Sequence, residues 1–367
     1  MADAPSPTAT TQPPYQAIST GRMALLFTVM LVTAAGNTAM QSVMPSIGTA
    51  LQLEDFWISL AYSWSALLWV TCAPIWARRS DKRGRKAMMA LGLVGFITSM
   101  GLCGLALWAG LAGYMGALAT LIFFAAARSL YGGFGSAAPP AVQAYVASRT
   151  ARSERTNALS LIASSFGLGT VLGPALAPLL IFPGLDLVGP FLAFAAIGVI
   201  ALVALRWRLP NDEPQFAARG KTFSEPFSAS SQSNHDHDDD EEDGSAETNT
   251  DEPKRLTWWE PRVRPWVIAG LVRGHAQAMV LGIVGFLVLD RMGLRSDPLS
   301  GAGPVGLVLM AGALATLVAQ WGVIPRFNLG PRAATLGGIA LAAFGVVIFA
   351  SSFSLNAIAF GYAIACL

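Results

Sequence analysis

The chain has 367 residues, of which 53% are hydrophobic and only 13% are charged. A soluble domain carries about 25% charged residues, so this composition excludes a domain that faces water on all sides. The net charge is only +2, which gives no reason to expect a nucleic-acid partner. The three cysteines, Cys72, Cys103 and Cys366, are scattered through apolar runs, a pattern that argues against a disulfide framework or a metal site.

Residues 1–22 are rich in Pro, Thr and Ala and lack the basic start and apolar run of a cleaved signal. We expect them to form a disordered cytoplasmic tail. A spanning helix needs about 20 mostly apolar residues. Nine later runs meet this length, at 23–45, 57–77, 87–109, 114–138, 157–182, 187–206, 265–290, 301–325 and 331–353. A tenth run begins near Leu355 and reaches the last residue, Leu367, too soon to cross a bilayer.

The connections between these runs alternate in charge. Basic connections lie at 77–87, 149–156, 206–265 and 325–332, and connections with carboxylates but no cation lie at 46–56 and 183–187. Because Lys and Arg concentrate in cytoplasmic loops, the amino terminus is predicted to be cytoplasmic. Arg291 and Arg295 are exceptions on an outer loop, where Asp290 and Asp297 partly balance them.

A long polar segment, 207–264, separates the first six runs from the rest. It includes an acidic run from His235 to Asp243, and such a composition cannot bury enough apolar surface to fold. We interpret it as a disordered cytoplasmic linker rather than a metal site, because nothing nearby supplies a rigid second shell of ligand partners. The linker divides the chain into a six-helix bundle, 23–206, and a second part, 265–367.

The connection between the second and third runs contains Asp81-Lys82-Arg83-Gly84-Arg85-Lys86. Gly84 permits a tight turn, and Asp81 can accept hydrogen bonds at a helix end while Arg85 pairs with a carboxylate. This order resembles the signature loop of the major facilitator superfamily, although Ala77 stands where that family usually has Gly. The resemblance implies that Asp81, Gly84, Arg85 and Lys86 take part in gating the cytoplasmic side. The alternative is a basic loop that only sets the topology.

The fifth run carries small residues at four-residue spacing, Ser165, Gly169, Gly173 and Ala177. Such a stripe lets a second helix approach closely. Pro174 and Pro178 in the same run remove amide donors and are predicted to kink the helix. Gly169, Gly173 and Pro174 together resemble the antiporter motif of drug exporters in the same superfamily. This resemblance favours export over import.

The fourth run contains Arg128, and an arginine at membrane depth should face a wet cavity or a polar partner. Snorkelling to the membrane interface is the alternative. Arg128-Ser-Leu-Tyr131-Gly132 resembles the family's Arg-x-x-Gln-Gly motif, with Tyr131 in place of the Gln. The resemblance implies a role for Arg128 in proton relay or substrate contact.

Thr33, Asn37 and Gln41 in the first run recur every four residues and therefore share one helix face. This polar face either lines a central cavity or makes hydrogen bonds between helices. Drug:proton antiporters, which this run resembles, often carry an acid where Asn37 stands. In the second run, Tyr62 and Trp69 also share a face, and they either stack on a substrate or contact the core or lipid.

The predicted spans hold no Asp or Glu except Asp290 at the outer end of the seventh. Proton coupling needs a group whose charge changes near neutral pH, and His275, close to Arg273, is the remaining candidate. An intramembrane His that only makes a hydrogen bond is the alternative.

Taken together, these motifs resemble the twelve-span drug:proton antiporters, which include tetracycline and multidrug exporters. The resemblance implies an all-α polytopic membrane protein of two six-helix bundles, with the second incomplete because nine to ten of twelve spans are visible. It also implies a monomer in a bacterial inner (plasma) membrane that exports small amphipathic molecules by proton antiport. The proton gradient would replace any cofactor. Because the tenth run stops at Leu367, we expect the sequence to be partial.

Two other classes of function stay open. Two intramembrane arginines without a carboxylate also suit a facilitator or exchanger of a small organic anion. A receptor or scaffold that no longer transports is a more distant alternative. An enzyme is not expected, because the sequence shows no Ser-His-Asp, Gly-x-Ser-x-Gly or His-Glu-x-x-His arrangement.

Overall fold

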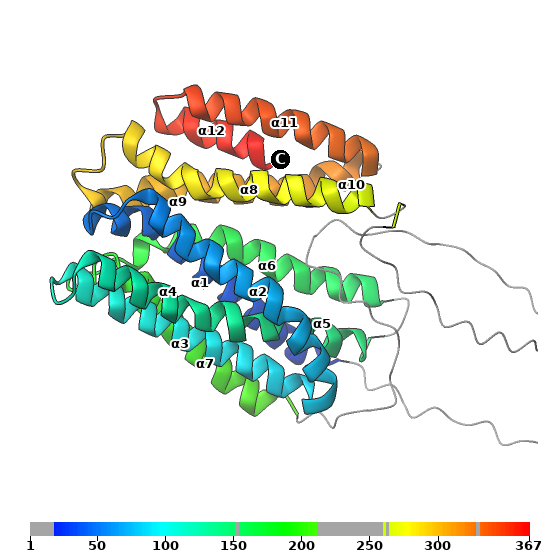
Figure 1. The fold of residues 1–367 in the computed structure, drawn as a ribbon. Helices are drawn as coiled ribbons and strands as arrows, with labels where there is room; N and C mark the ends of the chain where they lie inside the picture. The colour runs from blue at the N-terminus through cyan, green and yellow to red at the C-terminus, as the bar shows by residue number, and fades with distance from the viewer. Residues whose placement is uncertain (1–17, 151–153, 211–259, 262–263, 328–330) are drawn as a thin grey trace, which may run out of the picture. The chain divides into compact units, whose positions relative to one another are not determined.

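The computed structural model describes residues 18–150, 154–210, 260–261, 264–327 and 331–367. Almost all of the predicted acidic linker, and most of the predicted tail, lies outside the described residues. The elements are α1 (Thr20–Ala50), α2 (Asp55–Arg83), α3 (Arg85–Leu111), α4 (Ala117–Phe134), η1 (Gly135–Ala137), α5 (Ala138–Ala147), α6 (Arg155–Leu176), η2 (Pro178–Leu180), α7 (Gly189–Arg208), α8 (Arg264–Arg291), α9 (Pro298–Val318), η3 (Ala319–Val323), α10 (Ile324–Phe327), α11 (Pro331–Ser351) and α12 (Leu355–Cys366) (Figure 1).

In the part of the chain that the structure describes, nine helical stretches are long and apolar enough to cross a membrane. Each of them overlaps one of the nine predicted runs, although some ends differ. The tenth run forms α12, which has 12 residues.

The fourth span is longer than its sequence suggested. It was predicted to end at residue 138, but helix continues from α4 through the short 3₁₀ turn η1 into α5 and ends at Ala147. Pro139 and Pro140 do not stop it, because they occupy the first turn of α5, where backbone N–H groups have no partner to lose. The chain therefore stays helical from α4 to α5, with one 3₁₀ turn between the two α-helices.

The connection predicted for 77–86 is almost entirely helical. α2 continues to Arg83, α3 begins at Arg85, and Gly84 alone separates them. Gly84 has a φ of 89°, a conformation that residues with a Cβ rarely adopt. This confirms the tight turn predicted at Gly84 and corrects the length of the loop around it.

The chain divides into two compact units, one of Met1–Ser224 with Gly285–Leu367 and one of Glu225–Val284. In the first unit, α1 packs along α6, α7 and α9, while α3 packs along α4 and α7 (Figure 1). α11 and α12 form a pair of neighbours near the end of the chain. The second unit contains most of α8.

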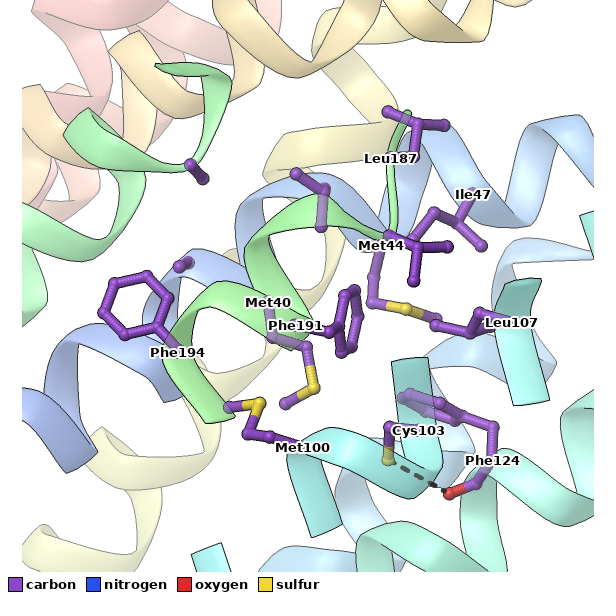
Figure 2. Packing of buried hydrophobic residues seen from close by; sticks show 14 of the residues in the cluster. Met40, Met44, Ile47, Met100, Cys103, Leu107, Phe124, Leu187, Phe191 and Phe194 are labelled. Atoms are coloured by element: carbon purple, nitrogen blue, oxygen red, sulfur yellow. Dashed lines mark hydrogen bonds between the residues drawn. The ribbon is translucent and has the colours of Figure 1, made fainter. Parts of the chain in front are cut away.

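The core of the first unit is built from flexible and aromatic side chains. Figure 2 shows Met40 and Met44 of α1 beside Phe191 of α7, with Cys103 of α3 close to Phe124 of α4. The Cys103 thiol donates a weak hydrogen bond to the Phe124 carbonyl oxygen at 3.7 Å. Between helices in lipid, close packing of this kind replaces the hydrophobic drive available in water. It holds α1, α3, α4 and α7 together around the site described next.

Candidate functional site

Arg128 lies on α4 and is only 4% exposed. Its Nη2 donates a hydrogen bond to Oδ1 of Asn37 on α1. The centre of its guanidinium lies 4.7 Å from the ring centre of Tyr131 and 5.5 Å from that of Tyr62 on α2. We call Asn37, Tyr62, Arg128 and Tyr131 the Arg128 cluster. It joins three helices through one cation.

The local sequence explains part of this arrangement. Arg128 and Tyr131 are three residues apart on one helix, so their side chains lie on the same face. A guanidinium over an aromatic ring is attracted by the negative face of that ring. Tyr131 occupies the position of the Gln in the Arg-x-x-Gln-Gly motif that this segment resembles. It therefore offers Arg128 an aromatic ring instead of an amide. The contact with Tyr131, on the same helix, therefore offsets part of the energetic cost of burying the Arg128 charge.

The cluster keeps unused hydrogen-bonding capacity. Nε and Nη1 of Arg128 and the hydroxyl of Tyr62 are buried and find no hydrogen-bond partner among the described residues. An arginine carries five N–H donors, and leaving buried donors unpaired is unfavourable. A ligand oxygen, whether carbonyl or carboxylate, is the kind of group that would satisfy them.

A shell of aromatic residues surrounds the cluster. The ring centre of Trp69 lies 5.1 Å from that of Tyr131, and the ring centre of Phe124 lies 6.2 Å from that of Tyr62. The Ser65 hydroxyl donates to the Arg128 carbonyl at 3.2 Å and fixes α2 against α4. Tyr62 and Trp69 thus share a face, as their spacing predicted. In this conformation that face contacts the core of the bundle.

The three residues of the polar stripe on α1, Thr33, Asn37 and Gln41, have different surroundings. The Thr33 hydroxyl donates to carbonyls of its own helix, at 3.1 Å from Val29 and 3.0 Å from Met30. Asn37 accepts a hydrogen bond from Arg128 of α4, which is the interhelical role expected as one of two alternatives for this stripe. Gln41 is half-buried one turn further along α1.

The small residues of α6 face α1. A Cβ added at Gly169 would lie 2.6 Å from Cβ of Ala34, and one added at Gly173 would lie 2.8 Å from the backbone nitrogen of Ala39. Thr38 of α1 also donates to the carbonyl of Gly169 at 3.3 Å. The two backbones therefore approach as closely as the stripe predicted.

The two prolines of this segment behave differently. Pro174 lies inside α6, as expected. Pro178 was predicted to kink the helix, but α6 ends at Leu176 and Pro178 opens the 3₁₀ turn η2. A proline just beyond a helix end removes no helical hydrogen bond, so Pro178 marks the end of the span rather than a bend within it.

The residues after the α2–α3 turn bind the ends of other helices. The Arg85 guanidinium donates to the Ser148 hydroxyl just after α5. Nζ of Lys86 donates to the carbonyls of Arg206 and Leu209 at 3.0 and 2.5 Å, and it thereby caps the carboxyl end of α7. Asp81 lies in the last turn of α2, and its side chain is outside what the structure describes.

Arg273 and His275 lie on α8 in the second unit, where both are exposed. Nδ1 of His275 is 2.8 Å from the carbonyl oxygen of Leu271 in the same helix. Their predicted part in a proton or substrate pathway stays a prediction.

One ionic contact was not predicted from the sequence. Arg295, which is an exception to the charge pattern, forms a two-pronged ion pair with Asp55. Asp290, five residues before Arg295, binds the same guanidinium. The presence of cations among connections that otherwise carry only carboxylates was the signal available in the sequence, but it did not identify Asp55 as a partner.

The sequence profile of the Major Facilitator Superfamily matches residues 26–367. The chain belongs to this superfamily. With the nine membrane-length helices found among the described residues, this confirms the predicted all-α membrane fold. It places the chain in a superfamily of transporters rather than in an enzyme family.

Two curated relatives give the family context. A triacylglyceride transporter of Mycobacterium tuberculosis is 30% identical over 199 residues, and multidrug resistance protein 2 of Bacillus subtilis is 28% identical over 179 residues. The matches cover 54% and 49% of this chain but only 36% and 41% of those relatives. The chain thus aligns with less than half the length of either relative.

Solved structures agree on the fold. A bacterial homologue of the human lysosomal transporter Spinster, in an inward-facing and occupied conformation, has a TM-score of 0.61 at 13% identity, with 97% of this chain and 72% of that one covered. The inward-open xylose transporter XylE from Escherichia coli has a TM-score of 0.57 at 12% identity, with 94% and 80% covered.

Proposed function

We propose that this protein is a secondary transporter that exports small amphipathic molecules by alternating access, driven by proton antiport across a bacterial plasma membrane. The observation that carries the proposal is the Arg128 cluster. A permanent cation is buried among membrane-length helices, bonded to one amide oxygen, with two further nitrogens unpaired. Polar groups at this depth mark substrate or ion pathways, because burying them without a use is costly.

In this proposal the cluster contacts the substrate. Nε and Nη1 of Arg128 and the Tyr62 hydroxyl offer hydrogen bonds, while the rings of Tyr62 and Tyr131 offer flat apolar surface. Amphipathic molecules combine these two needs. Gln41 and Trp69 extend the same polar and aromatic surfaces along α1 and α2.

Export is supported by two observations. The seam between α1 and α6 is built by Gly169 and Gly173 next to Pro174, the combination that resembles the antiporter motif of exporters. Two of the relatives are named a multidrug resistance protein and a multidrug resistance efflux pump.

Orientation is also part of the proposal. The basic end of α2 and α3, at Gly84, faces the cytoplasm, and the opposite end of α2, at Asp55, faces outward. His275 carries the proton, since His is the side chain whose charge changes near neutral pH.

A second candidate function rests on the same site. Arg128 has unpaired donors and the predicted spans offer no internal carboxylate to neutralise it, so the cluster also suits the anionic group of a small organic acid. The protein would then exchange or facilitate the movement of anions.

Transport by purified protein in proteoliposomes tests both candidates. We expect a pH gradient to drive uptake of chloramphenicol, an uncharged amphipathic molecule whose oxygens can accept hydrogen bonds from Arg128. Carboxyfluorescein, an organic anion, should compete poorly. The reverse preference supports the anion candidate. Loss of a charge-assisted hydrogen bond corresponds to about 1.5–3 kcal/mol, so Arg128→Ala should slow transport by about tenfold or more. Arg208→Ala, which removes an exposed arginine at the end of α7, is the matched control.

Unchanged transport in both Arg128→Ala and His275→Ala would exclude the proposed pathway. A change in Arg128→Ala alone would keep the substrate site and remove His275 from proton transfer.

A further inference from the structure

Three charged side chains meet at the end of α2 that lies opposite Gly84. Asp55 is the first residue of α2, Asp290 lies in the last turn of α8, and Arg295 lies in the connection between α8 and α9. Because α2 has 29 residues, Asp55 and Gly84 are about 43 Å apart along its axis. The charges therefore gather at one end of the helices, where Asp55 begins one membrane-length stretch and Asp290 lies next to the last residue of another.

The arginine is held on two sides. Its Nη1 and Nη2 lie 2.9 and 2.6 Å from the two carboxylate oxygens of Asp55. Its Nε and Nη2 lie 2.5 and 3.2 Å from the two oxygens of Asp290. Paired, parallel bonds of this kind are the strongest geometry available to arginine, and they fix orientation as well as charge.

The two carboxylates have different positions in the chain. Asp290 is five residues from Arg295, so its bonds are local and hold the guanidinium in place. Asp55 is 240 residues from Arg295, on the other side of the polar segment 207–264. Of the bonds that Arg295 makes, those to Asp55 connect the first six spans to the part of the chain that follows. The amino end of α2 also favours the negative charge of Asp55.

The environment preserves the arginine's charge. Hydrogen bonds to Asp55, and then to Asp290, raise the pKa of Arg295 above its ordinary value. The guanidinium side chain is 34% exposed, so solvent screens the pair but does not separate it.

The same parts of the chain also approach each other closely at two glycines. A Cβ added at Gly285 of α8 would lie 2.6 Å from Cγ of Pro45 on α1. One added at Gly301 of α9 would lie 2.9 Å from Oγ of Ser46. Ser46 is fully buried. Opening this end of the protein therefore has to separate α1 from α8 and α9 and break the Asp55–Arg295 pair.

We propose that Asp55, Arg295 and Asp290 form an outer latch, in which Asp290 positions Arg295 and the Asp55–Arg295 pair holds this end shut until the transport site opens toward it. This inference rests on the proposed alternating access. It assigns the conformational equilibrium, rather than substrate contact, to these three residues.

Labelling of a cysteine beneath the latch tests the proposal. Ser46→Cys serves as the reporter in a protein whose native Cys72, Cys103 and Cys366 are replaced by Ala. The protein is placed in nanodiscs, where both ends are accessible to a hydrophilic maleimide, so the readout depends neither on orientation nor on transport. Failure of the transport proposal would appear in the proteoliposome assay alone.

We expect Asp55→Asn and Arg295→Gln each to raise the labelling rate about fivefold, which corresponds to about 1 kcal/mol. Asp290→Asn should raise it less than about twofold, because the Asp55 bonds remain. Arg291→Gln is the control for loss of a nearby cation, since Arg291 binds the Ala350 carbonyl at 3.0 Å instead, and its labelling rate should be unchanged.

The double variant Asp55→Arg with Arg295→Asp keeps one arginine between two carboxylates and should restore the original rate. The latch is wrong if the single variants label no faster, if Asp290→Asn matches Asp55→Asn, or if the exchanged pair remains fast. Because every substituted latch residue is partly exposed, size-exclusion chromatography is expected to show folded protein throughout.

Discussion

Arg128 and Tyr131 stack within one turn of α4, with the guanidinium carbon 4.7 Å from the ring centre. The ring compensates for part of the burial of a charge that has a single hydrogen bond to the Asn37 side chain. This pairing explains how a cation persists inside the bundle. It also determines which substitutions should disturb the site.

Removing the ring should weaken the protein more than removing its hydroxyl. We expect Tyr131→Leu to lower the free energy of unfolding by about 1–2 kcal/mol through loss of the cation–π contact, and to reduce transport. Tyr131→Phe keeps the ring and is the matched control. Thermal unfolding in detergent measures the difference, and equal melting temperatures for the two variants would contradict the prediction.

Two substitutions of Asn37 should change the stability of the protein in opposite directions, because each changes the hydrogen bond to Arg128 differently. Asn37→Leu removes the acceptor and leaves Nη2 unpaired, which should destabilise the protein by about 1–3 kcal/mol. Asn37→Asp supplies a carboxylate at the same position and should raise the melting temperature, since charge-assisted bonds are stronger. A melting temperature for Asn37→Asp at or below that of Asn37→Leu would contradict the prediction.

The seam between α1 and α6 should reject even one methyl group. Gly173→Ala places a Cβ against the backbone of α1 and should destabilise the fold by about 1–3 kcal/mol. Gly101→Ala is the matched control, because a Cβ there meets nothing within 4 Å and alanine favours helix. Unfolding curves of the two variants should diverge in opposite directions from the parent protein. Coincident curves would mean that the seam has space.

The turn at Gly84 should require glycine for conformational reasons. Its φ of 89° is strained for any residue with a Cβ, so Gly84→Ala should cost about 1–3 kcal/mol. Gly133→Ala on α4, where nothing lies within 4 Å of the new Cβ, tests whether any loss is general to glycine replacement. Thermal unfolding again provides the measurement, with an unchanged melting temperature for Gly84→Ala as the contradicting result.

The sequence predicted the helices well because their signal is local. Runs of about 20 apolar residues located every membrane-length helix that the structure describes, and Gly84 marked its turn. Helix ends were harder to predict. Pro139 lies in the first turn of α5 and Pro178 in the first turn of η2, after the end of α6. A proline suits the first turn of either element, so its presence alone does not tell where a span ends.

The partners of charged residues were not predictable from local patterns. Burial of Arg128 indicated that it needs a polar partner, but its partner Asn37 is 91 residues away. The four-residue spacing did not distinguish Asn37 from Thr33 and Gln41, which lie on the same helix face. Asp55 and Arg295 are 240 residues apart, and each looked like an isolated charge on an outer loop. Packing of the helices selects among such candidates, and a single sequence does not encode that choice in any short motif.

The single-residue junction at Gly84 has a mechanical consequence. Neither α2 nor α3 has slack chain at that end, and Lys86, two residues on, is tied to the carboxyl end of α7. If α2 tilts when its Asp55 end moves, the movement is therefore transmitted through the single residue Gly84 to Lys86 and from there to the end of α7. No flexible loop lies between them to absorb it.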